Sequence, residues 1–203
     1  MKKFMSILLS LLMMLLPLAG WAEETATYIH ADGSFGFVYP ALWVELSRTV
    51  ISDVLKDDKA PRLLVELCKA LKPVAEETDL AMVTNLFTSD SIVVTREDLG
   101  AKLTDEQLLE NTRQLQEGMA QQNPGVVFEG EPVLLDSFDG EHTYAVLAYS
   151  GADAEGKSIA VAQARTMVDT MQYTIALTVY STDEEAAAAV EAMSWVMDTF
   201  TTW

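Results

Sequence analysis

Two histidines and one cysteine are the side chains with which this chain could do acid–base or nucleophilic chemistry near neutral pH. His30 lies near the start of the chain, in a stretch that we expect to be flexible. His142 follows the turn pair Asp139-Gly140, where an exposed polar residue is expected. Because no catalytic motif surrounds either ring, we predict that neither acts as a base.

Cys68 lies in the stretch RLLVELCKALK, where it shares one helical face with Leu64, Leu67 and Leu71. This spacing predicts a buried cysteine that behaves as a small apolar residue, with a nucleophilic role as the alternative. A single cysteine cannot form an internal disulfide, and the two separated histidines do not complete a zinc site with it. We therefore predict neither a metal nor a cofactor.

The serine and acidic motifs do not match known catalytic or calcium-binding patterns. The stretch DGSFG at residues 32–36 is not the Gly-x-Ser-x-Gly turn of a hydrolase, and the sequence has no glycine-rich phosphate loop. It also lacks the ladder of acids, central glycine and closing glutamate of a calcium loop. Asp136 and Asp139 could form an acid–base pair, but among 31 acidic residues such pairs arise by chance. We predict no catalytic residue.

Phe35, Phe37 and Tyr39 occupy alternate positions in the stretch DGSFGFVYPALWVEL and share one face of a predicted strand. Burying each ring is worth roughly 1.5 to 3 kcal/mol, so we expect a core face rather than a binding face. Trp43 follows this strand and is expected to close one end of the core, with stacking on a ligand as the alternative. Trp195 and Trp203 are expected to be partly exposed, and that end of the chain is the candidate partner surface.

Residues 1–22 have the features of an export signal. Two lysines precede an apolar run at residues 4–18, and Gly20 and Ala22 place small residues at the two positions that a signal peptidase inspects. We predict cleavage between Ala22 and Glu23, with an uncleaved anchor as the alternative. Because no cysteine directly follows the apolar run, we expect a secreted protein without a lipoprotein anchor.

The net charge limits the partners of the chain. Removal of the leader takes away two lysines and no acidic residue, so the formal charge changes from −18 to −20. Such a charge disfavours nucleic acid and anionic membrane surfaces, both of which attract clustered lysine and arginine. Residues 23–203 contain no Gly/Ser/Pro-rich linker, so we predict one domain and, by default, a monomer.

The first half of the chain alternates between strand and helix patterns. The aromatic strand ends at Pro40, and residues 47–72 carry two helical patterns, the first capped by Ser47 and the second ending before Pro73. Two strand-like runs then flank Ser89-Asp90 and predict a hairpin. Thr104 and Gln107 form a capping box that begins a further helix.

The second half is predicted to be an antiparallel meander closed by a helix. Its first hairpin turns at Asp139-Gly140, and residues 171–179 alternate between apolar and mostly polar side chains. Thr182, followed by Glu185, predicts the cap of the last helix. The helical stripe that we expect to pack on the sheet contains Val190, Met193, Met197 and Phe200.

Three features together resemble the PsbP-like or Mog-type fold, a superfamily that includes the extrinsic P subunit of photosystem II and a Ran-binding nuclear protein. They are GSFGFVYPALW near the mature start, the helix-then-meander middle, and the closing EAMSWVMDTFTTW. The resemblance implies an α+β fold with an antiparallel sheet sandwiched by helices and a helical insertion after the first strand. More closely, the chain is similar to uncharacterised exported proteins of gut Firmicutes that share the Tyr-Pro-x-x-Trp opening.

The superfamily consists mainly of non-enzymatic binding and assembly factors, so the resemblance implies fold and compartment rather than an activity. Neither a photosystem role nor a Ran role transfers, and no metal ligand of the superfamily matches a position here. We predict an exported, non-catalytic module that binds a protein or cell-envelope component whose identity the sequence does not give. The alternative is an envelope-associated hydrolase, which should have a deep pocket with convergent polar groups and a perturbed acid or histidine.

Overall fold

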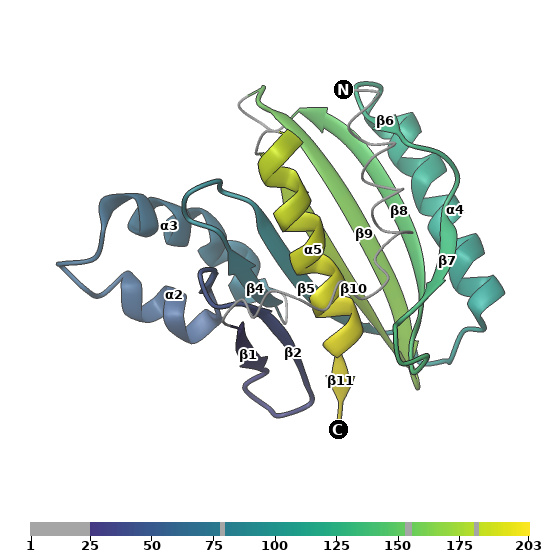
Figure 1. Ribbon diagram of the computed structural model, residues 1–203, viewed down its shortest axis with the longest axis horizontal. Helices are drawn as coiled ribbons and strands as arrows, with labels where there is room; N and C mark the ends of the chain where they lie inside the picture. The colour runs from purple at the N-terminus through teal and green to yellow at the C-terminus, as the bar shows by residue number, and fades with distance from the viewer. Residues whose placement is uncertain (1–24, 78–79, 153–155, 181–182) are drawn as a thin grey trace.

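The structure is a computed structural model that describes residues 25–77, 80–152, 156–180 and 183–203 (Figure 1). The predicted leader, its cleavage site between Ala22 and Glu23, and the predicted cap Thr182 lie outside the described residues. A large antiparallel sheet packs against helices, which confirms the predicted α+β class. No helix in the described part of the chain is long and apolar enough to cross a membrane.

The large sheet has eight strands, and all its pairings are antiparallel. Across the sheet the order is β3 (Val44–Glu45), β4 (Leu80–Thr84), β5 (Ser91–Asp98), β10 (Met171–Val179), β9 (Ser158–Val168), β8 (Thr143–Ala152) and β6 (Val127–Phe128), while β7 (Val133–Asp136) also pairs with β8. Both predicted hairpins and the meander are present. The β5–β10 ladder joins the first half of the chain to the second.

One face of this sheet, here called the inner face, carries the main core. On β10 the buried apolar residues are Tyr173, Ile175, Leu177 and Val179, as the alternation predicted. Their cross-strand neighbours continue the apolar face, since Ile175 pairs with Val94 on β5 and with Ala164 on β9. The opposite, outer face therefore receives the polar residues of the same strands.

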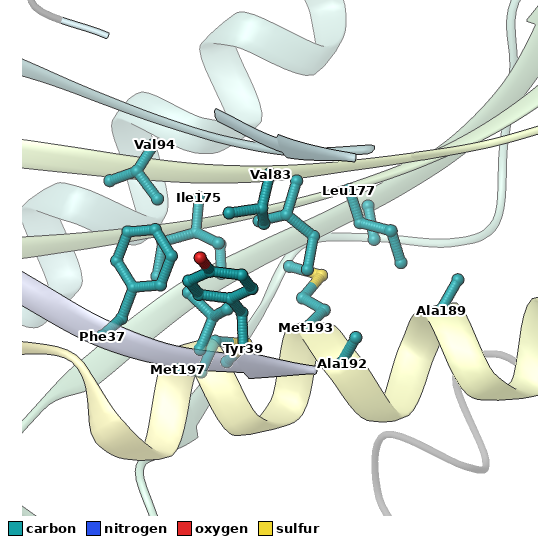
Figure 2. Packing of buried hydrophobic residues seen from close by; sticks show 14 of the residues in the cluster. Phe37, Tyr39, Val83, Val94, Ile175, Leu177, Ala189, Ala192, Met193 and Met197 are labelled. Carbon is teal, nitrogen blue, oxygen red and sulfur yellow. The ribbon is translucent and has the colours of Figure 1, made fainter. Parts of the chain in front are cut away.

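A three-stranded sheet and α5 (Asp183–Thr199) cover the inner face. The small sheet has the order β1 (Thr25–Ile29), β2 (Phe35–Pro40) and β11 (Thr201–Thr202). Phe35, Phe37 and Tyr39 are buried, so the prediction of a core face is confirmed. Figure 2 shows Phe37 and Tyr39 between the large sheet and the methionines of α5. Trp43 is buried in the same cluster, as expected.

Two helices cover the outer face at the β3–β4 end of the sheet. They are α2 (Arg48–Val54) and α3 (Arg62–Glu77), and they bury Leu46, Ile51, Cys68 and Met82 in a second core cluster. The main chain N–H of Val50 donates to the Ser47 hydroxyl, which confirms the predicted cap. Figure 1 shows this helical pair projecting from one side of the molecule.

The predicted helical insertion is present and begins after Ser47 as expected, but its place in the strand order and its length differ from the prediction. The helices follow the third strand rather than the first, because β1 and the two-residue β3 were not recognised. The second helix also continues through Pro73 to Glu77 instead of ending near Lys72. A proline removes one helical hydrogen bond, and Pro73 lies on the exposed side of α3, where this loss disturbs little packing.

The third helix on the outer face, α4 (Asp105–Gln122), packs mainly on β8. Its capping box is present as predicted: the Gln107 main chain donates to the Thr104 hydroxyl, and the Gln107 side chain accepts from the Thr104 main chain. Leu108 and Thr112 are buried against the sheet. The outer face of β5, β10 and β9 thus lies between the α2–α3 pair and α4.

Candidate functional site

His30 lies in an ordered position, so the prediction of a flexible start was wrong. Strand β1 pairs with β2, and the main chain N–H of His30 donates to the Phe35 carbonyl at 2.9 Å. The imidazole stacks on the Phe35 ring at a centroid distance of 4.6 Å, and its Nδ1 lies 3.1 Å from the Tyr28 hydroxyl. The His30 side chain therefore packs at the edge of the core, and the residue is only 8% exposed.

Next to His30 is a polar cluster whose residue types suggest a catalytic triad but whose connections differ from one. The Ser34 hydroxyl donates to Asp32 Oδ1 at 2.5 Å, and Arg96 Nη2 donates to Asp32 Oδ2 at 2.6 Å. These hydrogen bonds, that of Ser34 first, hold the pKa of the Asp32 carboxyl well below its usual range.

In a nucleophilic triad the serine gives its proton to the histidine, and the carboxylate orients that histidine. Here the Ser34 proton points to a carboxylate that is a weak base, and His30 Nε2 lies 3.8 Å from the same carboxylate. Arg96 also donates to the Ser34 hydroxyl. The cluster thus ties the β1–β2 turn to β5 rather than activating a nucleophile.

His142 and the two candidate acids lie at the predicted hairpin turn and stabilise it. Asp139 Oδ1 accepts from the Ser137 hydroxyl at 2.7 Å and from the Glu141 main chain at 3.0 Å, and these bonds lower the pKa of Asp139. Asp136 accepts from the Thr143 hydroxyl. The His142 ring contacts the buried Phe200 edge-on at 5.5 Å, so this histidine is half-buried rather than fully exposed.

The three described tryptophans differ in exposure. Trp43 is buried, Trp195 is half-buried and Trp203 is 71% exposed.

Trp203 donates its main chain N–H to the Ser34 carbonyl at 3.2 Å. A Cβ added to Gly36 would lie 2.9 Å from Cη2 of its ring, so the indole lies directly across Gly36. Ile29, the cross-strand partner of Gly36, is 60% exposed. We call Ile29, Gly36 and Trp203 the Trp203 surface.

A polar pocket of about 280 Å³ lies between the outer face of the large sheet and α4. Its floor comes from three neighbouring strands, with Thr95, Arg96 and Glu97 on β5, Gln172 and Thr174 on β10, and Gln163 and Arg165 on β9. The Arg96 guanidinium itself pairs with Asp32. Leu115 and Met119 of α4 form an apolar wall. We call this cavity the Arg165 pocket.

Arg165 is the unusual residue of this pocket. Its Nε is buried and has no hydrogen-bond partner. Burial lowers the pKa of the guanidinium, and the charge of Glu97 acts in the opposite direction. Within the part of the chain that the structure describes, no carboxylate forms an ion pair with Arg165. The pocket therefore holds a partly desolvated cation that the fold has not neutralised by direct pairing.

Sequence reasoning did not find this pocket. The only signal was the polar alternation of Gln163 and Arg165 in a mostly apolar strand, together with the polar face predicted for β10. Neither pattern shows which helix covers these residues. The pocket appears only when three strands and α4, which are distant in sequence, are placed together.

Comparison with known proteins supports the fold. No family model matches the chain, and no curated protein matches it. The solution structure of cyanobacterial PsbP (CyanoP) from Synechocystis superposes with a TM-score of 0.52 at 13% identity, covering 93% of this chain and 97% of that one.

Two further structures superpose less closely. The Saccharomyces cerevisiae Ran-binding protein Mog1p has a TM-score of 0.47 at 14% identity, covering 89% of this chain and 96% of that one. LpqN of Mycobacterium tuberculosis, described as involved in cell envelope biogenesis, has a TM-score of 0.48 at 13% identity, covering 88% and 90%. At 13% identity, the superposition with CyanoP shows a PsbP-like α+β fold and says nothing about activity.

Proposed function

We propose that this protein is an exported, non-catalytic binding module that engages a protein or cell-envelope component through the Trp203 surface. The observation that carries the proposal is the exposed indole of Trp203, held across Gly36 beside the exposed Ile29. Tryptophan is enriched among the residues that dominate binding energy at protein interfaces. An indole of this kind is an anchor that an apolar pocket of a partner could receive.

The position of Trp203 also lowers the cost of binding. The main chain of Trp203 is bonded to Ser34, and β11 pairs with β2, so the ring projects from an ordered sheet rather than from a free tail. An anchor held in place before association loses less conformational entropy when it binds. Position 36 must be glycine for this arrangement. A Cβ there would lie 2.9 Å from the Trp203 ring and 2.7 Å from the Tyr28 carbonyl oxygen, and both distances are too short.

Charge and the leader support the compartment and the kind of partner. The leader predicted at residues 1–22 favours secretion. A chain with a formal charge of −20 after cleavage associates best with a surface of opposite charge, since complementary potentials raise the rate of encounter. We therefore expect a partner in which an apolar pocket is rimmed by lysine and arginine.

A photo-crosslinking experiment tests this proposal. The photoreactive residue p-benzoylphenylalanine would replace Trp203 in the secreted protein, and Phe87 in a matched control. Phe87 is 91% exposed but lies in the turn between β4 and β5, outside the Trp203 surface. We expect a discrete adduct with a cell-surface component from position 203 only, weakened by added salt. Identical adducts from both positions, or none from position 203, would contradict the proposal.

A further inference from the structure

We propose that the Arg165 pocket binds a small monocarboxylic acid, with its carboxylate on the Arg165 guanidinium and its hydrocarbon part against Leu115 and Met119. This inference concerns the outer face of the large sheet and does not depend on the Trp203 surface. It rests on the unpaired cation, on the mixed walls of the pocket and on the position of Glu97.

The first observation is that the Arg165 guanidinium has no ion-pair partner among the described residues. Arg165 is half-buried and its Nε is fully buried. Removing part of a charge from water costs free energy, so arginines in such positions are usually paired with a carboxylate. This chain has 31 acidic residues and 13 basic ones, yet no described carboxylate lies within ion-pair distance of Arg165. A ligand carboxylate would supply the missing charge, and it matches the guanidinium because two parallel N–H donors can bind two oxygens.

The walls of the pocket give the size and shape of the ligand. Gln172, which is buried, and Thr174 provide polar groups beside Arg165, because Thr174 is its cross-strand neighbour. Leu115 and Met119 offer an apolar surface on the opposite side. A volume of about 280 Å³ lies just below the range of pockets for drug-sized molecules. The pocket thus suits a carboxylic acid with a short hydrocarbon chain.

Glu97 gives the charge selectivity. It lies in the same pocket, and its negative charge acts on Arg165. A second negative charge on the ligand would meet Glu97 and the acidic field of the whole chain. A monoanion neutralises Arg165 and brings no second charge near Glu97, so we expect a monocarboxylate to bind more tightly than a dicarboxylate or inorganic phosphate.

The test is a calorimetric titration of the purified protein with hexanoate, hexanamide, adipate and inorganic phosphate. We expect saturable binding of hexanoate, at least about tenfold weaker binding of neutral hexanamide, and weaker binding of both adipate and phosphate. Arg165→Met should weaken hexanoate binding by at least about tenfold. Arg113→Met is the matched control, because Arg113 lies on the exposed side of α4 and pairs with Glu110.

Stability measurements separate this role from a purely structural one. If Arg165 serves only the fold, Arg165→Met lowers the melting temperature. If its role is to bind a ligand, the ligand-free variant melts at the same or a higher temperature, since a half-buried charge without an ion-pair partner has been removed. Met119→Trp, which fills the pocket from α4, should also abolish hexanoate binding. Equal hexanoate binding by wild type and Arg165→Met, tighter binding of phosphate than of hexanoate, or no saturable carboxylate binding would overturn the inference.

Discussion

At the scale of single residues, the aromatic row of β2 shows how one strand face can hold two sheets together. Phe37 stacks on Tyr28 of β1 at a centroid distance of 4.9 Å and is almost completely buried. Phe35 meets Tyr173 of the large sheet edge-on at 5.5 Å. The rings therefore contact both the small sheet and the large one, and their loss would open the space between the two.

Replacement of Phe37 by alanine should be severely destabilising. It removes a buried ring and leaves a cavity, so we expect a loss of roughly 3 to 5 kcal/mol in the free energy of unfolding. That is a large part of the total of about 5 to 15 kcal/mol that is typical of proteins. Trp203→Ala, at an exposed site, should cost about 1 kcal/mol. Urea melts of both variants test this, and an unchanged midpoint for Phe37→Ala would mean that the row is not part of the core.

Asp32 should contribute to the acid sensitivity of the protein. Its pKa is lower in the folded state than in the unfolded chain, so its stabilising contribution is complete above about pH 4 and is lost as the pH falls below that value. Asp32→Asn removes this contribution. We expect the urea midpoints of wild type and Asp32→Asn to differ most near neutral pH and to converge below about pH 4. A difference independent of pH would mean that hydrogen bonding alone, without charge, holds the turn.

At the scale of elements, the sequence predicted those structures that short-range physics determines. The Thr104–Gln107 capping box and the alternation of β10 each depend on residues a few positions apart, and both are present. The fold class and the burial of the aromatic row followed from the same patterns.

The missed features depend on tertiary contacts. Strand β1 is short and follows the predicted leader directly, and it is stabilised by pairing with β2 and by the burial of Tyr28. Helix α3 continues beyond Pro73, although a proline normally marks the end of a helix. The Arg165 pocket likewise requires α4 to cover strands far from it in sequence. Local sequence patterns carry no information about tertiary contacts. Strand β1, the extension of α3 and the Arg165 pocket could therefore not be predicted from such patterns.

The accessibility of Cys68 in the α2–α3 pair can be tested directly. Cys68 is completely buried in the second core cluster, and burial raises the pKa of its thiol. Both effects keep the reactive thiolate rare and inaccessible, so thiol reagents should label the native protein slowly and the unfolded protein rapidly. Labelling followed at increasing urea would also report whether α2 and α3 detach before the rest unfolds. Rapid labelling without denaturant would show that this helical face is open.

At the scale of the whole molecule, export is predicted by the leader alone. Gly20 and Ala22 form the cleavage pattern after the apolar run, so N-terminal sequencing of protein recovered from the medium should begin at Glu23. Replacement of Ala22 by a bulky residue such as Phe should block processing at this site, while Ala26→Phe, beyond the site, should leave the cleavage position unchanged. Protein that stays in the membrane and still begins at Met1 would contradict this prediction.

The closure of the small sheet has a consequence for how the chain reaches its final state. The Val38 main chain N–H donates to the Thr199 hydroxyl at 2.8 Å across a separation of 161 residues, and α5 covers the rings of β2. Contacts between such distant segments form late, because the loop between them must be closed first. The N-terminal hairpin thus cannot bury its aromatic rings until the C-terminal helix has been synthesised. In a chain that is translocated from its N-terminus, this hairpin would cross the membrane unpacked and join the core only on the far side.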